Sequence, residues 1–220
     1  MSDETRLPEG GPRPPLPEPL PADPLPVLTD WLAEDSAAIP NATAMTLATV
    51  EPDGRPSARM VICRGFDSSA GWFVFYTDRE SPKGRALAAY PWAALVVHWD
   101  TFERQIRIEG PVTPASDAET DAYWESRPAD ARIAAVASRQ SEPIESRQEM
   151  LARVAAVAAR SATGIARPER WGGYRVWAER VELWVGQPAR VHDRAVSTRV
   201  LERTSEGYRG GPWRATRLQP

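Results

Sequence analysis

The sequence has few of the residues that bind metals or form disulfides. Among 220 residues it holds one cysteine, Cys63, and two histidines, His98 and His192. A single thiol excludes an internal disulfide, and these three side chains lack the spacing of a familiar metal site. Cys63 lies in an apolar run, where cysteine is more often a small core residue than a nucleophile. We therefore expect no bound metal and a reducing compartment, the cytoplasm.

Long apolar runs and a strong charge imbalance are also missing. No apolar segment approaches the roughly 20 residues that span a bilayer. The opening MSDETRLPEG has neither the basic nor the apolar region of a secretory signal. The net charge of −3 gives no electrostatic reason to bind nucleic acid. We expect a protein that has neither a membrane nor a nucleic acid as its partner.

The common catalytic signatures are absent as well. The chain has no G-x-G-x-x-G after a predicted strand, no P-loop and no G-x-S-x-G motif. An enzyme with this sequence would therefore depend on a bound cofactor for the difficult part of its chemistry.

Proline, in contrast, is abundant, and many of the 22 prolines lie before residue 27. Such a segment can bury little surface and repeatedly lacks backbone donors. We expect residues 1–26 to form an extended or mobile arm, and residues 27–220 to form one domain.

The domain itself consists of consecutive predicted strands with helices inserted between some of them. Strands are predicted within 44–67, 71–78, 92–100, 103–112, 171–186, 189–200 and 207–218, and helices within 27–38, 81–91, 116–128, 131–141 and 145–162. A Pro-Asp-Gly turn at 52–54 divides the first of these strand regions. Regular βαβ alternation is absent, so the pattern predicts an α+β fold, a mostly antiparallel barrel or sandwich with flanking helices.

Basic side chains gather at the ends of these elements. Met60 to Cys63 is an apolar run fit for a buried strand, with Arg59 and Arg64 at its two ends. Their odd separation would point them to opposite faces of a regular strand. Guanidinium groups are rarely buried without a partner, so the two arginines raise the question of which anions they meet.

Two further patterns favour an anion over the competing interpretation of solvated surface charges. Ser81 to Lys83 opens a predicted helix, where free N–H groups and the helix dipole suit a phosphate. In ARVHDR, strand alternation would place Arg190, His192 and Arg194 on one face, where they repel one another unless an anion or an electron-rich ligand lies across them.

Several segments together resemble the pyridoxine/pyridoxamine 5'-phosphate oxidases, in order and in spacing. They include AMTLATVEPDGRPSARMV, WFVFYT, SPKGRALAAYPWAAL, ERQIRIEG, ASRQSEPI, WGGYRV, VELWVGQPARVHDR and RLQP. The resemblance extends from about Pro21 to Pro220. It implies a split β-barrel, a homodimer with FMN at the subunit interface, and oxidation of the substrate with O2 as acceptor and H2O2 as product.

The resemblance also implies which residues form the site. The FMN contacts would be Arg59, Met60, Val61, Ile62, Cys63, Arg64, Tyr76, Thr77, Ser81, Lys83, Gln105, Gln140, Ser141, Trp184 and Arg194. Arg59 and Lys83 would meet the FMN phosphate, and Gln140 and Ser141 would reach FMN from the other subunit. The substrate contacts would be Arg64, Tyr123, Arg127, Arg190 and His192, with Arg190 and His192 over the substrate ring as the catalytic pair.

The sequence departs from the family pattern at several of these places. Arg64 replaces the usual lysine, Pro82 replaces an arginine that commonly contacts the FMN phosphate, and Ala131 replaces a serine in the substrate-phosphate cup. The N-terminal Arg-x-x-Tyr segment of the family is not visible. Most of these changes affect capture of the substrate.

These departures leave three functions open. We prefer oxidation of pyridoxine or pyridoxamine 5'-phosphate to pyridoxal 5'-phosphate. SPKGR, YPWA and SRQSE also resemble the related phenazine-biosynthesis oxidases, which would make the substrate a reduced tricyclic aromatic. A non-catalytic flavin- or pyridoxal-phosphate-binding relative is the third alternative.

Overall fold

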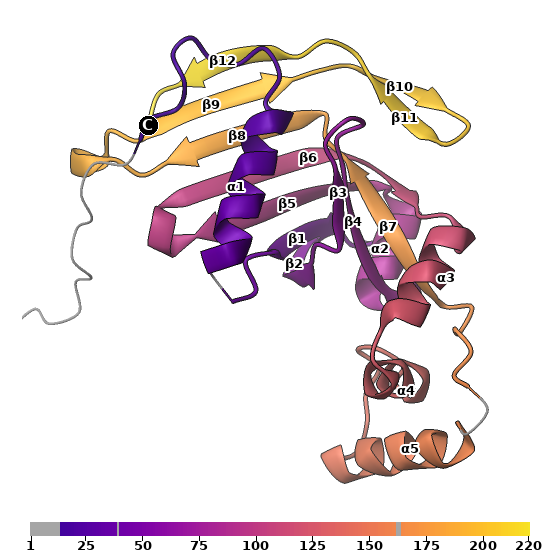
Figure 1. The fold of residues 1–220 in the computed structure, drawn as a ribbon. Coiled ribbons are helices and arrows are strands. Elements are labelled where there is room, and N and C mark those ends of the chain that lie inside the picture. The colour runs from indigo at the N-terminus through magenta and orange to yellow at the C-terminus, as the bar shows by residue number, and fades with distance from the viewer. Residues whose placement is uncertain (1–13, 39, 162–163) are drawn as a thin grey trace, which may run out of the picture.

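A curled antiparallel sheet organises the computed structural model, which describes residues 14–38, 40–161 and 164–220. Seven of its strands follow the order β12-β9-β8-β6-β5-β1-β2, and β7, β4 and β3 continue from β6 as a second arm (Figure 1). The strands are β1 (Ala44–Val50), β2 (Pro56–Ile62), β3 (Gly65–Asp67), β4 (Trp72–Asp78), β5 (Trp92–Trp99), β6 (Arg104–Pro114), β7 (Trp171–Trp177), β8 (Arg180–Val185), β9 (Asp193–Thr198), β10 (Leu201–Thr204), β11 (Gly207–Gly210) and β12 (Arg214–Leu218). The sheet is antiparallel throughout, which confirms the α+β prediction.

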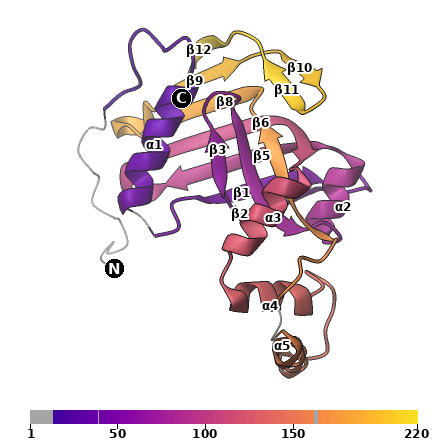
Figure 2. The same ribbon diagram turned by 45° about the vertical axis from the view of Figure 1, so that its right-hand side comes forward.

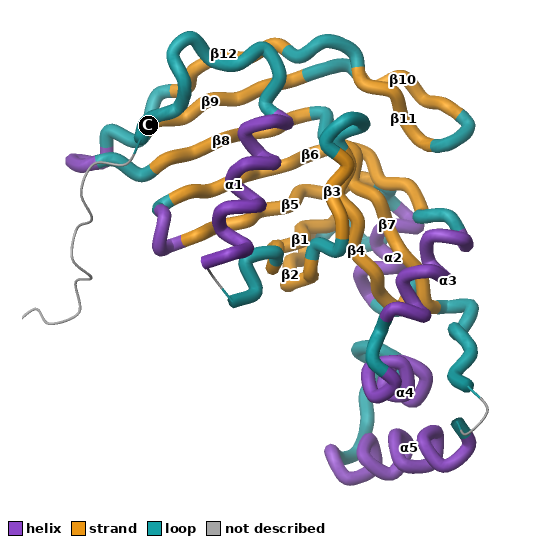
Figure 3. Tube along the Cα trace, in the orientation of Figure 1, coloured by secondary structure: helices purple, strands orange, loops and turns teal. Residues whose placement is uncertain are grey.

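The helices begin at the signals that the sequence offers. They are α1 (Leu25–Ala38), α2 (Pro82–Ala89), α3 (Asp117–Ser126), α4 (Ala129–Ala137) and α5 (Arg147–Arg160), with short 3₁₀ turns at Asp100–Phe102 and Pro188–Arg190. Ser116 and Glu119 cap α3 reciprocally, each side chain accepting the other's backbone N–H. Pro82 occupies the first turn of α2, where its missing N–H costs nothing. Figure 3 shows α1 lying across one face of the sheet, with α3, α4 and α5 beyond its end.

The hydrophobic core lies on one face of the sheet. Leu47, Leu95, Ile108 and Val181 stand in one register row across β1, β5, β6 and β8, and each is fully buried. Helix α1 lies across this core face in Figure 1 and adds Leu28 to it. The second arm of the sheet supplies further core residues. We call the opposite side of the β1–β2–β5–β6–β8–β9 sheet the outer face.

The outer face is the side on which Gln105, Arg107 and Glu109 of β6 point, because side chains alternate along a strand. These three residues are half-buried, whereas Ile106 and Ile108 between them are fully buried. On the same face Met60 is 61% exposed and Trp92 is 49% exposed. The outer face therefore carries large apolar and charged side chains side by side.

Helices α4 and α5 extend away from the sheet beyond the end of α3 (Figure 2). They pack on each other, and the structure shows no buried residue in either one. The connection between them, which contains Gln140, returns to the sheet at Thr77. This return brings the predicted site residues of that connection to β4.

Three predictions about local structure were wrong. Residues 207–218 form β11 and β12, which lie in different sheets, instead of one strand. Residues 189–192 are not extended, because Ala189 and Arg190 both have positive φ and β9 begins only at Asp193. The segment from Met60 to Cys63 is not a buried strand throughout, since β2 is an edge strand and Met60 is largely exposed.

The described part of the proline-rich arm packs against the domain. Leu16 is 3% exposed, and its backbone N–H donates to Oδ2 of Asp193 at 2.7 Å. Arg217 of β12 pairs with Glu18 at 2.7 Å and also contacts Asp193. Helix α1 begins at Leu25, inside the predicted arm. Residues 1–13 lie outside the described part of the chain, and the division into an arm and a domain stays a prediction.

No helix in the described residues is long and apolar enough to cross a membrane.

Candidate active site

Lys83 is the centre of a buried polar cluster at the start of α2. Its ammonium lies 2.6 Å from Oε1 of Gln140, 3.1 Å from Oγ of Ser81 and 3.2 Å from Oγ1 of Thr77. No carboxylate is paired with Lys83 among the described residues. Burial lowers the pKa of Lys83 from 10.5 to about 8, with a further contribution from the positive charge of Arg59. In the Lys83 cluster (Thr77, Ser81, Lys83 and Gln140) the ammonium is therefore hydrogen-bonded by neutral dipoles, and the carboxylate of Asp78 partly offsets the lowering of its pKa.

Arg59 reaches the same region from β2 and points to the core face, opposite Leu47 in the register. Its guanidinium donates to Oγ1 of Thr49 and Oγ of Ser57, both at 2.7 Å, and pairs with Glu51 at 3.3 Å. Burial lowers its pKa, and Glu51 partly offsets this effect. The positive charge of Arg59 also lowers the pKa of Lys83, so the two cations interact electrostatically.

Gln140 lies against residues of its own chain. The Thr77 hydroxyl donates to the same Oε1 that accepts from Lys83, at 2.9 Å. These two contacts lie within one chain, and the expectation that Gln140 reaches FMN from the other subunit stays a prediction. Ser141 follows it with φ of 68°, a left-handed conformation that turns the chain sharply after Gln140.

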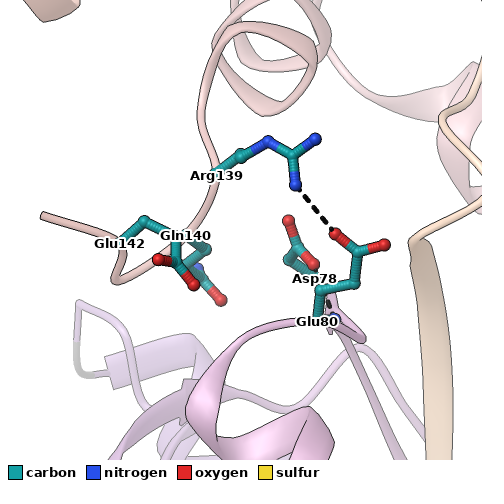
Figure 4. Close-up of a pocket in the computed structure, with 5 residues that line it drawn as sticks. All are labelled: Asp78, Glu80, Arg139, Gln140 and Glu142. Atoms are coloured by element: carbon teal, nitrogen blue, oxygen red, sulfur yellow. Dashed lines mark hydrogen bonds and ion pairs between the residues drawn. The ribbon is translucent and has the colours of Figure 1, made fainter.

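A small acidic pocket lies beside Gln140 (Figure 4). It is lined by Asp78, Glu80, Arg139, Gln140 and Glu142 and encloses about 10 Å³. Arg139 pairs with Glu80 at 3.3 Å. This volume is about that of one water, and the three carboxylates repel an anion. The acidic pocket therefore cannot be the phosphate site.

Three aromatic rings form a stack next to the Lys83 cluster. The Tyr76 ring lies 4.1 Å from Tyr123 and 5.5 Å from Trp171, in nearly parallel planes. Tyr76 pairs with Gly173 across β4 and β7, and a Cβ at Gly173 would lie 2.7 Å from the Tyr76 ring. The glycine thus allows the ring to lie flat on β7, within the aromatic stack of Tyr76, Tyr123 and Trp171.

Two guanidinium groups flank the aromatic stack. Arg64 lies 5.8 Å from the centre of the Tyr123 ring, and Arg127 lies 5.1 Å from that of Trp171. Arg127 donates to the Ala131 carbonyl at 3.1 Å, while its buried Nε has no partner. The structure therefore brings together Arg64, Tyr123 and Arg127, the three predicted substrate residues that precede residue 130.

A pocket of about 410 Å³ opens between this stack and the Lys83 cluster. Its lining residues are Tyr76, Thr77, Asp78, Arg127, Ala131, Ala134, Ala135, Ser138, Gln140 and Trp171. The three alanines make the α4 wall apolar, and Arg127 is the cation in this lining. The pocket could hold one planar ring with an anionic group at Arg127.

Gln105, Trp184 and Arg194 form a separate group on the outer face. They stand directly opposite one another on β6, β8 and β9, so their side chains share that face. β9 is five strand positions from β2, or about 24 Å along the sheet at the usual strand spacing. The outer-face row (Gln105, Trp184 and Arg194) thus begins about 14 Å from β2 and ends about 24 Å from it along the sheet.

His192 and Arg190 lie in the turn that leads into β9. The His192 ring is 4.7 Å from the Trp184 ring, and its Nδ1 accepts the backbone N–H of Gln187 at 3.2 Å. Arg190 has φ of 60° and is exposed. The prediction that Arg190, His192 and Arg194 share a strand face was wrong, because only Arg194 belongs to β9.

The predicted flavin-lining segment leaves the sheet edge after Ile62, where β2 ends. Met60 points to the outer face, whereas Val61 packs against the core. Cys63 is buried and donates its S–H to the Gly65 carbonyl, and burial raises the pKa of its thiol. A thiol in this state is a poor nucleophile, as expected from the sequence.

Two residues of this region were not predicted from the sequence. Trp171 stacks with Tyr76 and contacts Arg127, but its motif WGGY gave no sign of this because the partners are distant in sequence. Glu182 pairs with Arg194 on the outer face. Its position two residues before Trp184 on a predicted strand is the signal that could have identified it.

Comparisons with known proteins were made against this geometry. The family model described as pyridoxamine 5'-phosphate oxidase matches residues 32–161, and that of the pyridoxine 5'-phosphate oxidase C-terminal dimerisation region matches residues 171–220. A pyridoxine/pyridoxamine 5'-phosphate oxidase of Rhodospirillum rubrum is 47% identical over 205 residues, which cover 90% of this chain and 96% of that protein. A protein of the same name from Gluconobacter oxydans is 45% identical, with 91% and 96% covered.

Solved structures agree with these matches. PhzG from Burkholderia lata, in complex with tetrahydrophenazine-1-carboxylic acid, superposes with a TM-score of 0.78 and 31% identity, covering 91% of this chain and 94% of its own. A pyridoxamine 5'-phosphate oxidase-related, FMN-binding protein of Nostoc punctiforme has a TM-score of 0.68 at 20% identity, covering 89% and 96% of the two chains. The predicted split-barrel fold is thereby confirmed.

Proposed function

Because the chain belongs to the pyridoxamine 5'-phosphate oxidase family, an oxidase family, we propose that it oxidises pyridoxine or pyridoxamine 5'-phosphate to pyridoxal 5'-phosphate with FMN as cofactor. The observation that carries this proposal is the adjacency of two cationic subsites. Thr77 belongs to the Lys83 cluster, and its neighbour Tyr76 belongs to the aromatic stack beside Arg127. Two phosphates, one of the cofactor and one of the substrate, would occupy them.

The residues of the Lys83 cluster fit a cofactor phosphate. Lys83 is buried without a carboxylate partner, an arrangement that is costly unless an anion neutralises it. Arg59 adds a second cation, and the first turn of α2 adds backbone N–H groups. Pro82 can contribute neither a guanidinium nor an N–H. We propose that Arg59, Thr77, Ser81 and Lys83 hold the phosphate of FMN.

Bound FMN would supply the two-electron acceptor, which no side chain of this protein can provide. Arg127 and Arg64 would bind the substrate phosphate, and the aromatic stack would border the substrate ring. The apolar α4 wall excludes water on one side of the pocket. With pyridoxine phosphate and O2 the products are pyridoxal phosphate and H2O2. The amine substrate also consumes water and releases ammonia.

His192 is held in one tautomer in this structure. Its Nδ1 accepts the Gln187 N–H, so the neutral ring carries its proton on Nε2, which remains available to a ligand. Arg190 presents its guanidinium from the same turn. We propose that Arg190 orients the substrate and that His192 donates from Nε2 to a polar group of the substrate.

A homodimer would complete the site. Arg194 lies five strand positions, or about 24 Å along the sheet, from the strand that carries Arg59, so we propose that a second copy brings Trp184 and Arg194 to the cofactor. The exposed Met60 and Trp92 on the same face support its burial against another chain. The match of residues 171–220 to a dimerisation region supports the same assembly. We also propose that the protein acts in the cytoplasm.

Anaerobic reduction of the purified yellow protein tests the substrate. Pyridoxine and pyridoxamine 5'-phosphate should bleach the flavin within one turnover, whereas unphosphorylated pyridoxine at the same concentration should not. Arg127→Gln should weaken the response to the phosphates, and Arg132→Gln, a change in the adjoining helix, serves as the matched control. Colourless protein that takes up no FMN would contradict the proposal.

The alanine-lined wall favours a second candidate, oxidation of a reduced tricyclic aromatic. Ala131, Ala134 and Ala135 offer an apolar surface where a hydroxyl would help to bind phosphate. The PhzG structure, in complex with a tetrahydrophenazine carboxylic acid, is a related fold at 31% identity. Bleaching by a dihydrophenazine carboxylate that is faster than bleaching by the vitamin B6 phosphates would establish this function instead.

A further inference from the structure

Glu182 is a buried carboxylate on the otherwise half-exposed outer face. It belongs to β8, two residues before Trp184, and is 3% exposed. A buried carboxylate is costly unless cations or hydrogen-bond donors surround it. The side chains around Glu182 must therefore supply the cations or donors that offset this cost.

Two guanidinium groups share Glu182, one from each neighbouring strand. Arg194 of β9 donates to Oε1 through Nη2 at 2.7 Å and Nε at 3.2 Å, and Arg107 of β6 donates to Oε2 at 3.1 Å. The two hydrogen bonds to Oε1 of Glu182 restrain the direction of the Arg194 side chain. Nη1 of Arg194 in addition donates to the Gln219 carbonyl at 3.1 Å. Three N–H donors of Arg194 are thus engaged within the chain, and two stay free for a ligand.

Glu182 also controls how much positive charge the outer face presents. Arg107, Glu109, Glu182 and Arg194 together carry a formal charge of zero, and without the Glu182 carboxylate they would carry +1. The reduced flavin ring is more negative than the oxidised ring, so extra positive charge near it favours reduction. A carboxylate that contacts Arg194 lowers this preference.

We propose that Glu182 is a positioning residue that aims Arg194 at the cofactor and limits the positive charge there, an inference that rests on the proposed FMN site. It acts through Arg194 and needs no contact with substrate. Trp184 and Gln105 share the register row with Arg194 on the outer face.

The test uses FMN-loaded full-length dimers of Glu182→Gln. Removing the charge should raise the preference for reduced over oxidised FMN about tenfold, which is ~30 mV for a two-electron couple. The dissociation constant of oxidised FMN, measured by fluorescence quenching, should rise about tenfold because Arg194 is no longer fixed. Glu182→Asp keeps the charge but shortens the side chain. It should leave the potential unchanged and weaken FMN, which keeps the test decisive if Glu182→Gln fails to fold.

Glu109→Gln is the matched control. Glu109 pairs with Arg107 at 2.7 Å on the same face but forms no ion pair with Arg194 in the described part of the chain, so the potential should move less than in Glu182→Gln. In an Arg194→Gln background, Glu182→Gln should cause a smaller shift, because only Arg107 remains beside residue 182. A lowered Tm with unchanged potential and FMN affinity, or an equal shift without Arg194, would overturn this inference alone. Wild-type protein that binds no FMN would overturn the proposed function as well.

Discussion

The Lys83 ammonium lies 2.6 Å from the side-chain carbonyl of Gln140, and no carboxylate neutralises it. Its pKa is lowered to about 8, chiefly by burial, so Lys83 is charged below pH 8 and becomes neutral above it. Only the charged form attracts a phosphate. The affinity for FMN should therefore be constant below pH 8 and fall about tenfold between pH 7 and pH 9.

Fluorescence titration at several pH values measures this fall. Lys83→Gln should bind FMN more weakly at pH 7 and should lose the pH dependence. In the FMN-free protein the effect on stability has the opposite sign. Between pH 8 and 10.5 the unfolded chain binds more protons at this lysine, so this group stabilises the fold as the pH rises. A pH dependence that survives in Lys83→Gln would assign the titration to another group.

Pro82 offers a gain-of-affinity prediction. It occupies the first turn of α2 next to Lys83, where the family commonly has arginine. Pro82→Arg should lower the dissociation constant of FMN about tenfold, because a charge-assisted hydrogen bond to phosphate is restored. Pro82→Ala removes the ring without adding a cation and should change the affinity less than twofold. If both variants lower the dissociation constant of FMN equally, the loss of the proline ring causes the effect and the added cation does not.

Ala131 offers a prediction about the substrate. Its carbonyl already accepts from Arg127, and its side chain lines the 410 Å³ pocket. Ala131→Ser should lower the KM for pyridoxamine 5'-phosphate about fivefold with little change in kcat, because one hydroxyl donor is added to the phosphate subsite. Ala134→Ser, on the same wall, is the control. If both variants leave KM unchanged in steady-state assays, the phosphate binds elsewhere.

The turn before β9 stores backbone strain. Ala189 has φ of 56° and is exposed, so Ala189→Gly removes an unfavourable left-handed alanine without losing buried contacts. The Tm should rise by about 2 °C, since the relief of about 1–2 kcal/mol is partly offset by the entropy of glycine. Arg190→Gly should relax the same turn but cost at least about 100-fold in kcat/KM. A lower Tm for Ala189→Gly in calorimetry would contradict the strain.

The sequence predicted those parts of the fold that depend on local signals. The helices predicted within 81–91 and 116–128 and the strand predicted within 103–112 all appear where they were expected. Leu16 was missed because the composition of a proline-rich segment conceals a single buried side chain. The left-handed Ala189 was missed because left-handed turns are normally marked by glycine or asparagine.

The site was predictable only as a set of residues, without its arrangement. The resemblance indicated Thr77, Lys83 and Gln140, but Gln140 lies 63 residues from Thr77, and only the fold shows that they meet in one chain. Strand alternation wrongly grouped Arg194 with Arg190 and His192, and no local pattern could show that β9 lies five strands from β2. The order and register of the whole sheet, which no local pattern encodes, set the distance between the Lys83 cluster and Arg194.

This separation has a genetic consequence. If Lys83 and Arg194 serve the same cofactor from different subunits, a Lys83→Gln chain and an Arg194→Gln chain can complement each other. A mixed dimer collects both defects in one of its two sites and leaves the other intact. Random reassortment of the two inactive proteins should therefore restore about a quarter of wild-type activity, whereas two variants on the same side of the interface, Lys83→Gln and Arg59→Gln, should restore none.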